Sequence, residues 1–301
     1  MNPIASLGLP PLPADLARVE EGLREAVRSD DQFLGEVAVH LVKAGGKRIR
    51  PALTLCAAYA TAGTEQPASD EAETRRGVPA VNARWSNIVA ILAGDFLLAR
   101  ASELAASLGA DVAGLLAGTI GELCRGQVLE LQYLFDVDRT EDRYLAAIRG
   151  KTAALFATAC RIGGMVNEID GPTLDALTEF GRHLGLCFQI VDDVLDVTAS
   201  DDTLGKQAGK DLLEGVYTLP VIYALAGSDA LRELIGRPLD PDALRRAREI
   251  VTSDGAVSAA LDAARAEAKQ ADEALSGADR LDVAVCGSLR ALVDGLVTRS
   301  S

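Results

Sequence analysis

Residues 185–197 read GLCFQIVDDVLDV and place three carboxylates inside an apolar run. Asp192 and Asp196 are four residues apart and share one helix face, and Gln189 lies about one turn before them. Burying unpaired carboxylates is costly, so this helix needs cations beside it. Oxygen ligands without histidine or cysteine favour a hard ion such as Mg²⁺. The alternative, that Asp192, Asp193 and Asp196 lie on a solvated face, is disfavoured by the flanking apolar residues.

Helical spacing of apolar residues continues along most of the 301-residue chain. The hydrophobic content of 49% is enough for a large core. Alternating strand patterns bounded by turn signals are absent, so we predict an all-α bundle forming one domain over residues 1–301. The further runs at helical spacing are 34–42, 88–101, 112–134, 144–166 and 217–225.

Composition narrows the range of functions. The net charge of −14 argues against a nucleic-acid partner and requires that any anion site be built from locally clustered cations. The five cysteines include no CxxC pair, and the N-terminus lacks the basic start of a signal peptide. No stretch approaches the ~18 uncharged apolar residues of a membrane span. We therefore expect a cytoplasmic protein without a transmembrane segment.

Two basic segments are candidates for anion binding. Residues 205–211, GKQAGKD, follow the aspartates closely enough for Lys206 to fold back toward them and help hold a diphosphate. Residues 45–51, GGKRIRP, put Lys47 and Arg50 at an expected helix start, where phosphate binds readily. Each segment has a simpler interpretation, as an ordinary loop and as a basic surface cap respectively.

Two further segments are weaker by themselves. ETRRG at residues 73–77 is equally consistent with a solvated charge run. IRGKTAALF at 148–156 puts Lys151 and Thr152 where they open an apolar helix and could point at phosphate, or merely cap that helix. Four of the six lysines directly follow a glycine, which permits close backbone approach, although coincidence on solvated loops is the alternative.

Together these segments resemble the trans-isoprenyl diphosphate synthases, most closely the bacterial medium- and long-chain members. The resemblance covers nearly the whole chain and rests on GGKRIRP, DEAETRRGVPAVNARW, LAGDFLLARA, GKTAALF, FQIVDDVLD and GKQAGKDLLEGVYTLP, in family order. It implies an isoprenoid synthase-type bundle around a central apolar cavity, and a homodimer. It also implies Mg²⁺-dependent condensation of isopentenyl diphosphate with an allylic diphosphate into a longer trans-polyprenyl diphosphate.

The resemblance also implies roles for individual residues. Those that would bind isopentenyl diphosphate are Gly46, Lys47, Arg50 and Arg76. Those that would bind the allylic diphosphate are Arg75, Lys151, Thr152, Gln189 and Lys206. Those that would bind metal are Asp70, Asp192, Asp193 and Asp196. The residues expected to act directly in catalysis are Lys151, Lys206 and Asp192.

The chain departs from the family at its first DDxxD motif. Asp70 matches the last aspartate of that motif, but Gln66 and Pro67 stand at its first two aspartates. Roughly 25 residues, or about 37 Å of helix, are missing between Gly63 and Asp70. Loss of a core helix leaves a void and exposes the apolar faces of its neighbours. A second departure is Val216, where many relatives have a lysine.

Three interpretations of the missing helix remain open. The sequence omits a segment of the natural protein, the gene carries a deletion that impairs the product, or the chain is a non-catalytic homologue that binds isoprenoid diphosphates. The third interpretation includes the possibility that the chain is a regulatory subunit that needs a catalytic partner. A terpene cyclase of related fold is a further alternative, but it would not need the isopentenyl diphosphate segment GGKRIRP.

Overall fold

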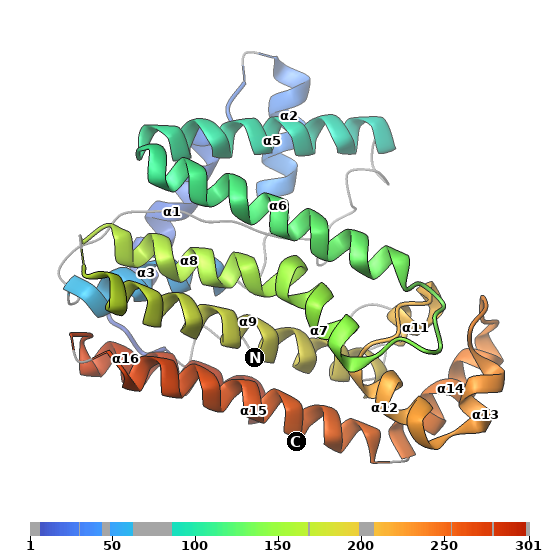
Figure 1. Cartoon of the computed structure of the whole chain (residues 1–301). Coiled ribbons are helices and arrows are strands. Elements are labelled where there is room, and N and C mark those ends of the chain that lie inside the picture. Colours follow the sequence, from blue (N-terminus) through green and yellow to red (C-terminus); the bar gives the residue numbers. More distant parts are fainter. Residues whose placement is uncertain are drawn as a thin grey trace. The chain divides into compact units, whose positions relative to one another are not determined.

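The computed structural model describes residues 7–29, 31–43, 49–62, 86–167, 169–198, 208–253, 255–278 and 280–298. Within these ranges every regular element is a helix (Figure 1). The all-α prediction is therefore confirmed for the part of the chain that the structure describes.

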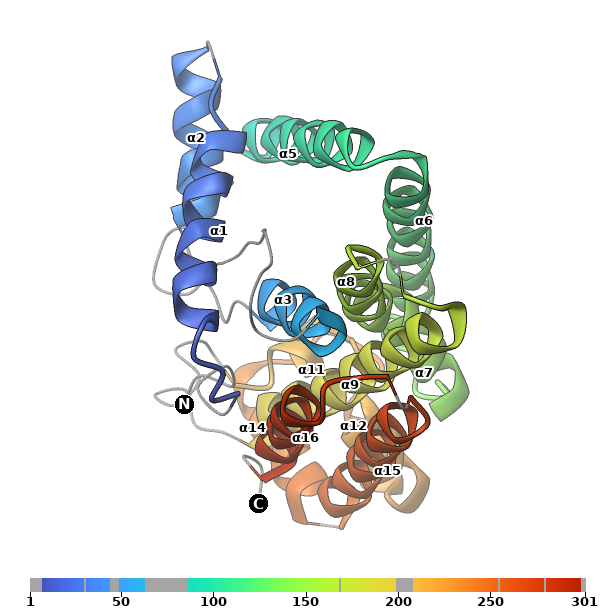
Figure 2. The same cartoon turned by 90° about the vertical axis from the view of Figure 1, so that its left-hand side faces the viewer.

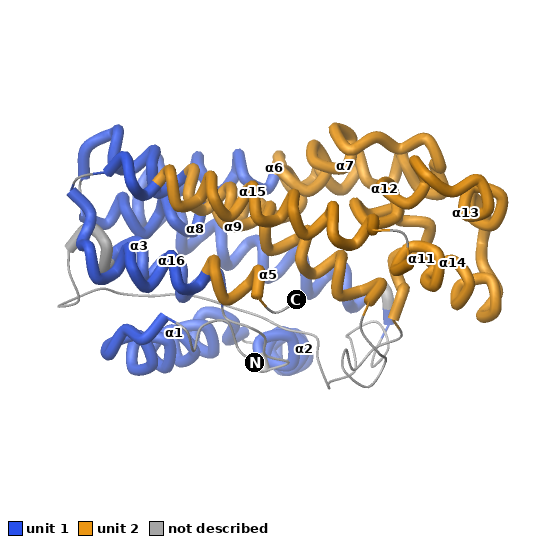
Figure 3. The backbone as a smooth tube through the Cα atoms, turned by 90° about the horizontal axis from the view of Figure 1, so that it is seen from below, with its two compact units in different colours: residues 1–120, 158–178, 275–292 blue, residues 121–157, 179–274, 293–301 orange. Residues whose placement is uncertain are grey.

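The helices are, in chain order, α1 (Leu12–Ala26), α2 (Gln32–Lys43), α3 (Ile49–Ala62), α5 (Asn87–Ser107), α6 (Ala110–Gln132), α7 (Glu141–Ile148), the π-helical turn η2 (Arg149–Ala153), α8 (Ala154–Met165), α9 (Gly171–Thr198), α11 (Lys210–Glu214), α12 (Leu219–Gly227), α13 (Asp229–Leu234), α14 (Pro241–Ser253), α15 (Ala256–Ser276) and α16 (Val283–Val297). They form two compact units (Figure 3). The first unit comprises residues 1–120, 158–178 and 275–292, and the second comprises 121–157, 179–274 and 293–301. That residues 1–301 form a single domain stays a prediction.

Hydroxyl side chains fix the starts of several helices. Ser86, Thr140 and Ser228 precede α5, α7 and α13, and each hydroxyl accepts a hydrogen bond from the backbone N–H three residues on, at 3.1 to 3.4 Å. Such caps satisfy an N–H that has no partner within the helix and typically stabilise it by ~1 kcal/mol. The start of α7 matters most here, because α7 leads directly into the turn that carries Lys151.

In the first unit, α5 crosses α2 (Figures 1 and 2). The contact between them is apolar: Val37 and Ala93 are fully buried, and Leu41, Val89 and Ala90 pack around them. One side of α5 thus has a core of its own in this unit.

The opposite side of α5 is exposed. Ile88, Ile91 and Leu92 are 71%, 64% and 58% exposed, and Leu98 is exposed as well. Apolar residues therefore lie on both sides of α5, which is typical of a helix covered all round rather than of one at a surface. That a helix is missing beside α5 stays a prediction.

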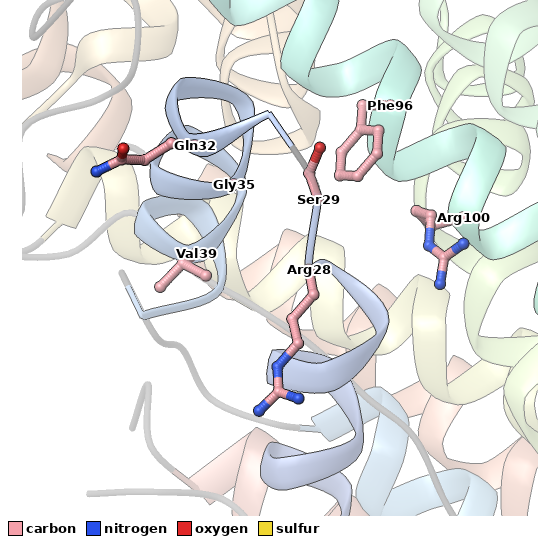
Figure 4. Close-up of a pocket in the computed structure, with 7 residues that line it drawn as sticks. All are labelled: Arg28, Ser29, Gln32, Gly35, Val39, Phe96 and Arg100. Atoms are coloured by element: carbon pink, nitrogen blue, oxygen red, sulfur yellow. The ribbon is translucent and has the colours of Figure 1, made fainter.

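The first unit also contains a pocket of about 660 Å³ (Figure 4). Its lining residues come from the α1–α2 connection, from α2 and from α5: Arg28, Ser29, Gln32, Gly35, Val39, Phe96 and Arg100. Both arginines are engaged, because Arg28 pairs with Glu25, and Arg100 binds the Ala26 carbonyl and Glu103. None of the residues predicted to bind substrate or metal lines this pocket.

The second unit holds two apolar clusters. One joins α11 through α14 around Tyr217, Val221 and Leu244. The other joins α7, α9 and α15 around Tyr144 and Ile190. The second cluster places the carboxylate-bearing part of α9 against α7, so the acidic residues of that helix lie at the edge of a well-packed core.

No helix among the described residues has the length and apolar character needed to cross a membrane.

Candidate functional site

The predicted acidic motif lies near the end of α9 and is largely buried. Asp193 and Asp196 are 4% and 2% exposed, while Asp192 is partly exposed. A carboxylate removed from water needs hydrogen-bond donors or cations to remain ionised. The neighbours of each aspartate therefore indicate what it does.

Asp193 is held by two protein donors. The Tyr144 hydroxyl donates to its Oδ2 atom at 2.7 Å, and the Gln189 amide donates to its Oδ1 atom at 2.7 Å. Burial, followed by the charge of Asp211, raises the pKa of Asp193 to about 8, although these two hydrogen bonds act in the opposite direction. Burial and the neighbouring Asp193 charge also raise the pKa of the Tyr144 phenol well above its usual value.

Asp196 anchors the end of the basic segment 205–211. Its Oδ2 atom accepts from the Asp211 backbone N–H at 3.1 Å, and its carbonyl accepts from the Gly209 N–H at 2.7 Å. Gly209 has φ +75°, a left-handed conformation that favours glycine, and an added Cβ would lie 2.7 Å from the Arg248 side chain. These contacts fix residues 208–211 against α9. Lys206 itself lies outside the described residues.

Lys151 and Thr152 lie in η2, a single π-helical turn between α7 and α8. Such turns occur frequently at functional sites. The Lys151 ammonium group pairs with the Glu130 carboxylate on α6, and the Thr152 hydroxyl donates to the Gln189 Oε1 atom at 2.7 Å. The prediction that these residues open a helix was therefore wrong, since η2 continues α7. The predicted neighbours Thr152 and Gln189 do come together.

Close helix packing explains the glycine before Lys151. A Cβ on Gly150 would lie 2.4 Å from the Glu122 carbonyl oxygen, and one on Gly126 would lie 2.3 Å from the backbone nitrogen of Lys151. Real Cβ atoms do not approach backbone atoms so closely, so both positions require glycine. The close approach of α6 and η2 also brings Glu130 to Lys151. For this lysine, the expectation that glycine permits close backbone approach is confirmed.

Three buried residues of the site were missed by sequence reasoning: Glu130, Tyr144 and Arg139. Glu130 is 8% exposed, and its position inside the apolar run 112–134 was a usable signal. Tyr144 stood in a helical run and was taken as an apolar position. Nothing in the local sequence distinguishes Arg139 from the other arginines.

The remaining predicted residues are less well placed. Arg50 lies in the first turn of α3, is exposed, and its carbonyl accepts from the Thr54 hydroxyl at 3.2 Å. The predicted residues that lie outside the described part of the chain are Gly46, Lys47, Asp70, Arg75, Arg76 and Lys206. Among the described residues, no group of three or more His, Cys, Asp or Glu side chains is arranged to hold a metal ion.

A carboxylate-bearing helix joined by hydrogen bonds to a Lys-Thr turn, in an all-helical protein, defines a site suited to diphosphate and divalent cations. Comparison with known proteins gives the same class. The family model for polyprenyl synthetase matches residues 68–251. The chain belongs to the polyprenyl synthetase family.

Two of the similar curated proteins are bacterial synthases of medium and long chains. Heptaprenyl diphosphate synthase component 2 of Geobacillus stearothermophilus is 42% identical, over 70% of this chain and 73% of its own length. Nonaprenyl diphosphate synthase of Mycobacterium tuberculosis is 36% identical, over 95% of this chain and 92% of its own length.

Solved structures agree with this assignment. A decaprenyl diphosphate synthase from Rhodobacter capsulatus is 34% identical with a TM-score of 0.85, covering 96% of this chain and 97% of its own. A polyprenyl synthase from Caulobacter crescentus, in complex with calcium and isoprenyl diphosphate, is 31% identical with a TM-score of 0.88. The match covers 99% of this chain and 98% of the C. crescentus chain. This chain is therefore a trans-polyprenyl diphosphate synthase, of the class that condenses isopentenyl diphosphate with allylic diphosphates.

The alignments also contain positions that this chain does not fill. The alignment with the M. tuberculosis synthase runs over 312 positions and covers 95% of this chain. Because 95% of 301 residues is about 286, about 26 aligned positions hold no residue of this chain. A nonaprenyl synthase from R. capsulatus gives the same difference, since 294 positions cover 89%, or about 268 residues.

Proposed function

We propose that the site on α9 and η2 binds the allylic diphosphate together with Mg²⁺, and that Asp192 is its direct metal ligand. Two observations support this. Asp192 is partly exposed, whereas Asp193 and Asp196 are buried, so Asp192 is the most accessible of the three carboxylates. The donor set is oxygen only, which fits a hard divalent ion that is also bound by phosphate oxygens. Asp193 and Asp196 then support the site from the protein side, and Asp70 would contribute the remaining carboxylate.

The cations of the site receive the diphosphates. The allylic diphosphate would be lined by Lys151 and Thr152, which η2 places, and by Gln189 on α9. Lys206 and Arg75 would add positive charge to this site. Lys47, Arg50, Arg76 and the Gly46 backbone would hold isopentenyl diphosphate. Glu130 keeps the Lys151 ammonium group in place while no diphosphate is bound, because the two side chains are paired. A bound diphosphate would then share this lysine.

The reaction follows from these charges. Lys151 and Lys206 stabilise the negative charge that develops on the departing diphosphate, so the allylic C–O bond breaks. The bound Mg²⁺ would supply further charge neutralisation to the same oxygens. The double bond of isopentenyl diphosphate attacks the allylic carbocation and forms the new C–C bond. The proton lost afterwards passes to the departing diphosphate, and the apolar core beside α9 excludes water from the cation.

A second function, diphosphate binding without turnover, is favoured by a separate set of observations. About 26 aligned positions of the relatives are unfilled, and one face of α5 is exposed and apolar. We place the unfilled positions between Gly63 and Asp70, where the sequence lacks the first two aspartates of the family motif. On this proposal the chain lacks a helix that supplies metal ligands, and turnover is impaired while the α9 site remains.

One experiment separates the two functions. The 301-residue chain is incubated with Mg²⁺, labelled isopentenyl diphosphate and farnesyl diphosphate, and the products are sized. A second chain carries the corresponding segment of the M. tuberculosis synthase inserted between Gly63 and Asp70. Polyprenyl products from both chains support full catalysis. Products from the restored chain alone support a binding-competent but impaired protein, and products from neither, without diphosphate binding, contradict both functions.

The partners follow from the same observations. We propose a homodimer, which would cover the exposed apolar residue Ile91 on α5. The net charge of −14 makes nucleic acid an unfavourable partner. Sedimentation velocity of the wild-type chain and of Ile91→Asp tests the dimer, because an aspartate in an apolar interface should release monomers.

A further inference from the structure

Arg139 has an unusual environment for an arginine. It lies between α6 and α7 and is 3% exposed. Its Nη1 atom donates to the Tyr217 carbonyl at 2.9 Å, whereas Nε and Nη2 have no hydrogen-bond partner among the described residues. Burial lowers the pKa of this guanidinium, while the charges of Glu130, Tyr144, Asp193 and Asp136 oppose that shift. An arginine stays charged in proteins, so a cation with two unused donors is buried beside the acidic site.

Burying an incompletely bonded guanidinium is expensive, and an apolar side chain of similar size would usually stabilise the core better. A function is therefore needed to explain Arg139. Its contacts indicate one, because its guanidinium carbon lies 5.6 Å from the centre of the Tyr144 ring, over the ring face. Tyr144 in turn touches the acidic motif.

From Tyr144 a chain of hydrogen bonds leads to the predicted ligand side. The Tyr144 hydroxyl donates to Asp193 at 2.7 Å, Gln189 donates to the other oxygen of Asp193 at 2.7 Å, and Thr152 donates to Gln189 at 2.7 Å. Each member uses its polar atoms on its neighbours, so the position of one side chain fixes that of the next. Gln189 and Thr152 are the members that we assign to the allylic diphosphate.

We propose that Arg139 and Tyr144 are positioning residues for the diphosphate site, acting through Asp193 and Gln189 on Thr152 and on the neighbouring Asp192. Arg139 holds the Tyr144 ring by its charge and offsets the negative charge of the nearby Glu130 carboxylate. Tyr144 holds the Asp193 carboxylate from the side opposite Gln189. Neither residue touches the reacting atoms. This inference rests on the proposed assignment of the α9 and η2 site to the allylic diphosphate.

The alternative is that Tyr144 and Arg139 only fill the core. The two roles differ in what a variant changes: a core residue lowers stability, whereas a positioning residue also changes how Mg²⁺ and diphosphate bind. Residues that orient metal ligands typically change metal affinity or activity by ~10- to 100-fold when they are replaced.

Calorimetric binding of inorganic diphosphate to the full chain, over a series of Mg²⁺ concentrations, tests the proposal. Tyr144→Phe keeps the ring and removes only the hydroxyl, and we expect it to raise the half-saturating Mg²⁺ concentration about 10-fold. Arg139→Lys keeps the charge but not the planar group, and Arg139→Met removes both. We expect Arg139→Met to weaken binding more than Arg139→Lys.

Tyr217→Phe is the matched control. Tyr217 is as buried as Tyr144, its hydroxyl accepts from the Gly236 N–H at 2.6 Å, and its carbonyl, which binds Arg139, is left in place by this substitution. It should lower the melting temperature as Tyr144→Phe does, but change Mg²⁺ dependence by less than about twofold.

Unchanged Mg²⁺ dependence in Tyr144→Phe, or an equal change in Tyr217→Phe, would overturn the proposal. If Arg139→Met does not fold, the Mg²⁺ dependence of Tyr144→Phe alone tests the proposal. If the wild type shows no Mg²⁺-dependent binding of diphosphate, the proposed function fails and the positioning role fails with it.

Discussion

The α9 region of the second unit and the α5 region of the first unit differ in how completely their side chains are covered. Around α9 every buried aspartate oxygen described above has a donor, and α6 meets η2 through glycines that leave no free space. On α5, by contrast, three large aliphatic residues are more than half exposed. The described residues of the proposed diphosphate site are therefore closely packed, whereas α5 in the first unit carries exposed apolar side chains.

The largest effect should come from the aspartate that we assign to metal. Asp192→Ala should reduce turnover by at least ~10²-fold in whichever chain is active, because it removes charge that holds Mg²⁺ on the departing diphosphate. Lys47→Ala should have a similar effect through isopentenyl diphosphate. Steady-state product formation measures both, and full activity in both variants would reject the assigned roles.

Glycine replacements compare covered and open positions along α6. Gly126→Ala should lower the free energy of unfolding by about 3 kcal/mol, since the new Cβ meets the backbone of η2. Gly114→Ala, on the same helix with nothing within 4 Å of an added Cβ, should instead raise it by up to ~1 kcal/mol through helix propensity. Urea unfolding gives both values, and equal losses would show that α6 is packed alike along its length.

The raised pKa of Asp193 predicts that pH affects the stability of the α9 region. This pKa is raised from 3.8 to about 8 on folding, so the folded chain binds this proton more tightly than the unfolded chain does. The stability that this proton contributes is fully present below the pKa of Asp193 in the unfolded chain. It is lost as the pH rises toward the pKa of Asp193 in the folded chain. Without metal, wild-type stability relative to Asp193→Asn should fall by up to about 1.4 kcal/mol per pH unit between about pH 5 and about pH 7. A pH-independent difference would contradict the buried carboxyl.

The smallest effect is expected on α5. Leu92→Gln should change the free energy of unfolding by less than ~0.5 kcal/mol in the 301-residue chain at low protein concentration, because this side chain is already exposed. In the chain with the restored segment it should cost more than ~2 kcal/mol, as expected for a buried position. Equal costs in the two chains would mean that the inserted segment does not cover α5.

The sequence predicted the helical class and the pairing of Gln189 with the motif, because both depend on spacing along one helix. It also predicted the neighbourhood of Thr152 and Gln189 through the family resemblance. It did not predict that η2 is a π-helical turn, or that Asp193 is bound by Tyr144. Those features depend on contacts between segments far apart in the chain, such as the crossing of Gly126 and Gly150, which local spacing does not encode.

The three aspartates show the same limit. Their pattern on α9 indicated a group of metal ligands, yet their contacts suggest different tasks. Asp193 joins α9 to α7, and Asp196 joins it to the residues before α11. Helix periodicity gives the face on which a carboxylate lies, but the donors that meet it are set by packing.

The most direct test of a complete diphosphate site is Mg²⁺-dependent binding of a non-reactive thiolodiphosphate analogue of farnesyl diphosphate. It should be measured by calorimetry on the wild type, Lys151→Met and Lys269→Met. Lys269 is the matched lysine, exposed on α15 and paired with Glu273. We predict that the wild type binds, that Lys151→Met binds at least ~10-fold more weakly and that Lys269→Met is unchanged. Absence of Mg²⁺-dependent binding in the wild type, or equal losses in the two variants, would contradict the account.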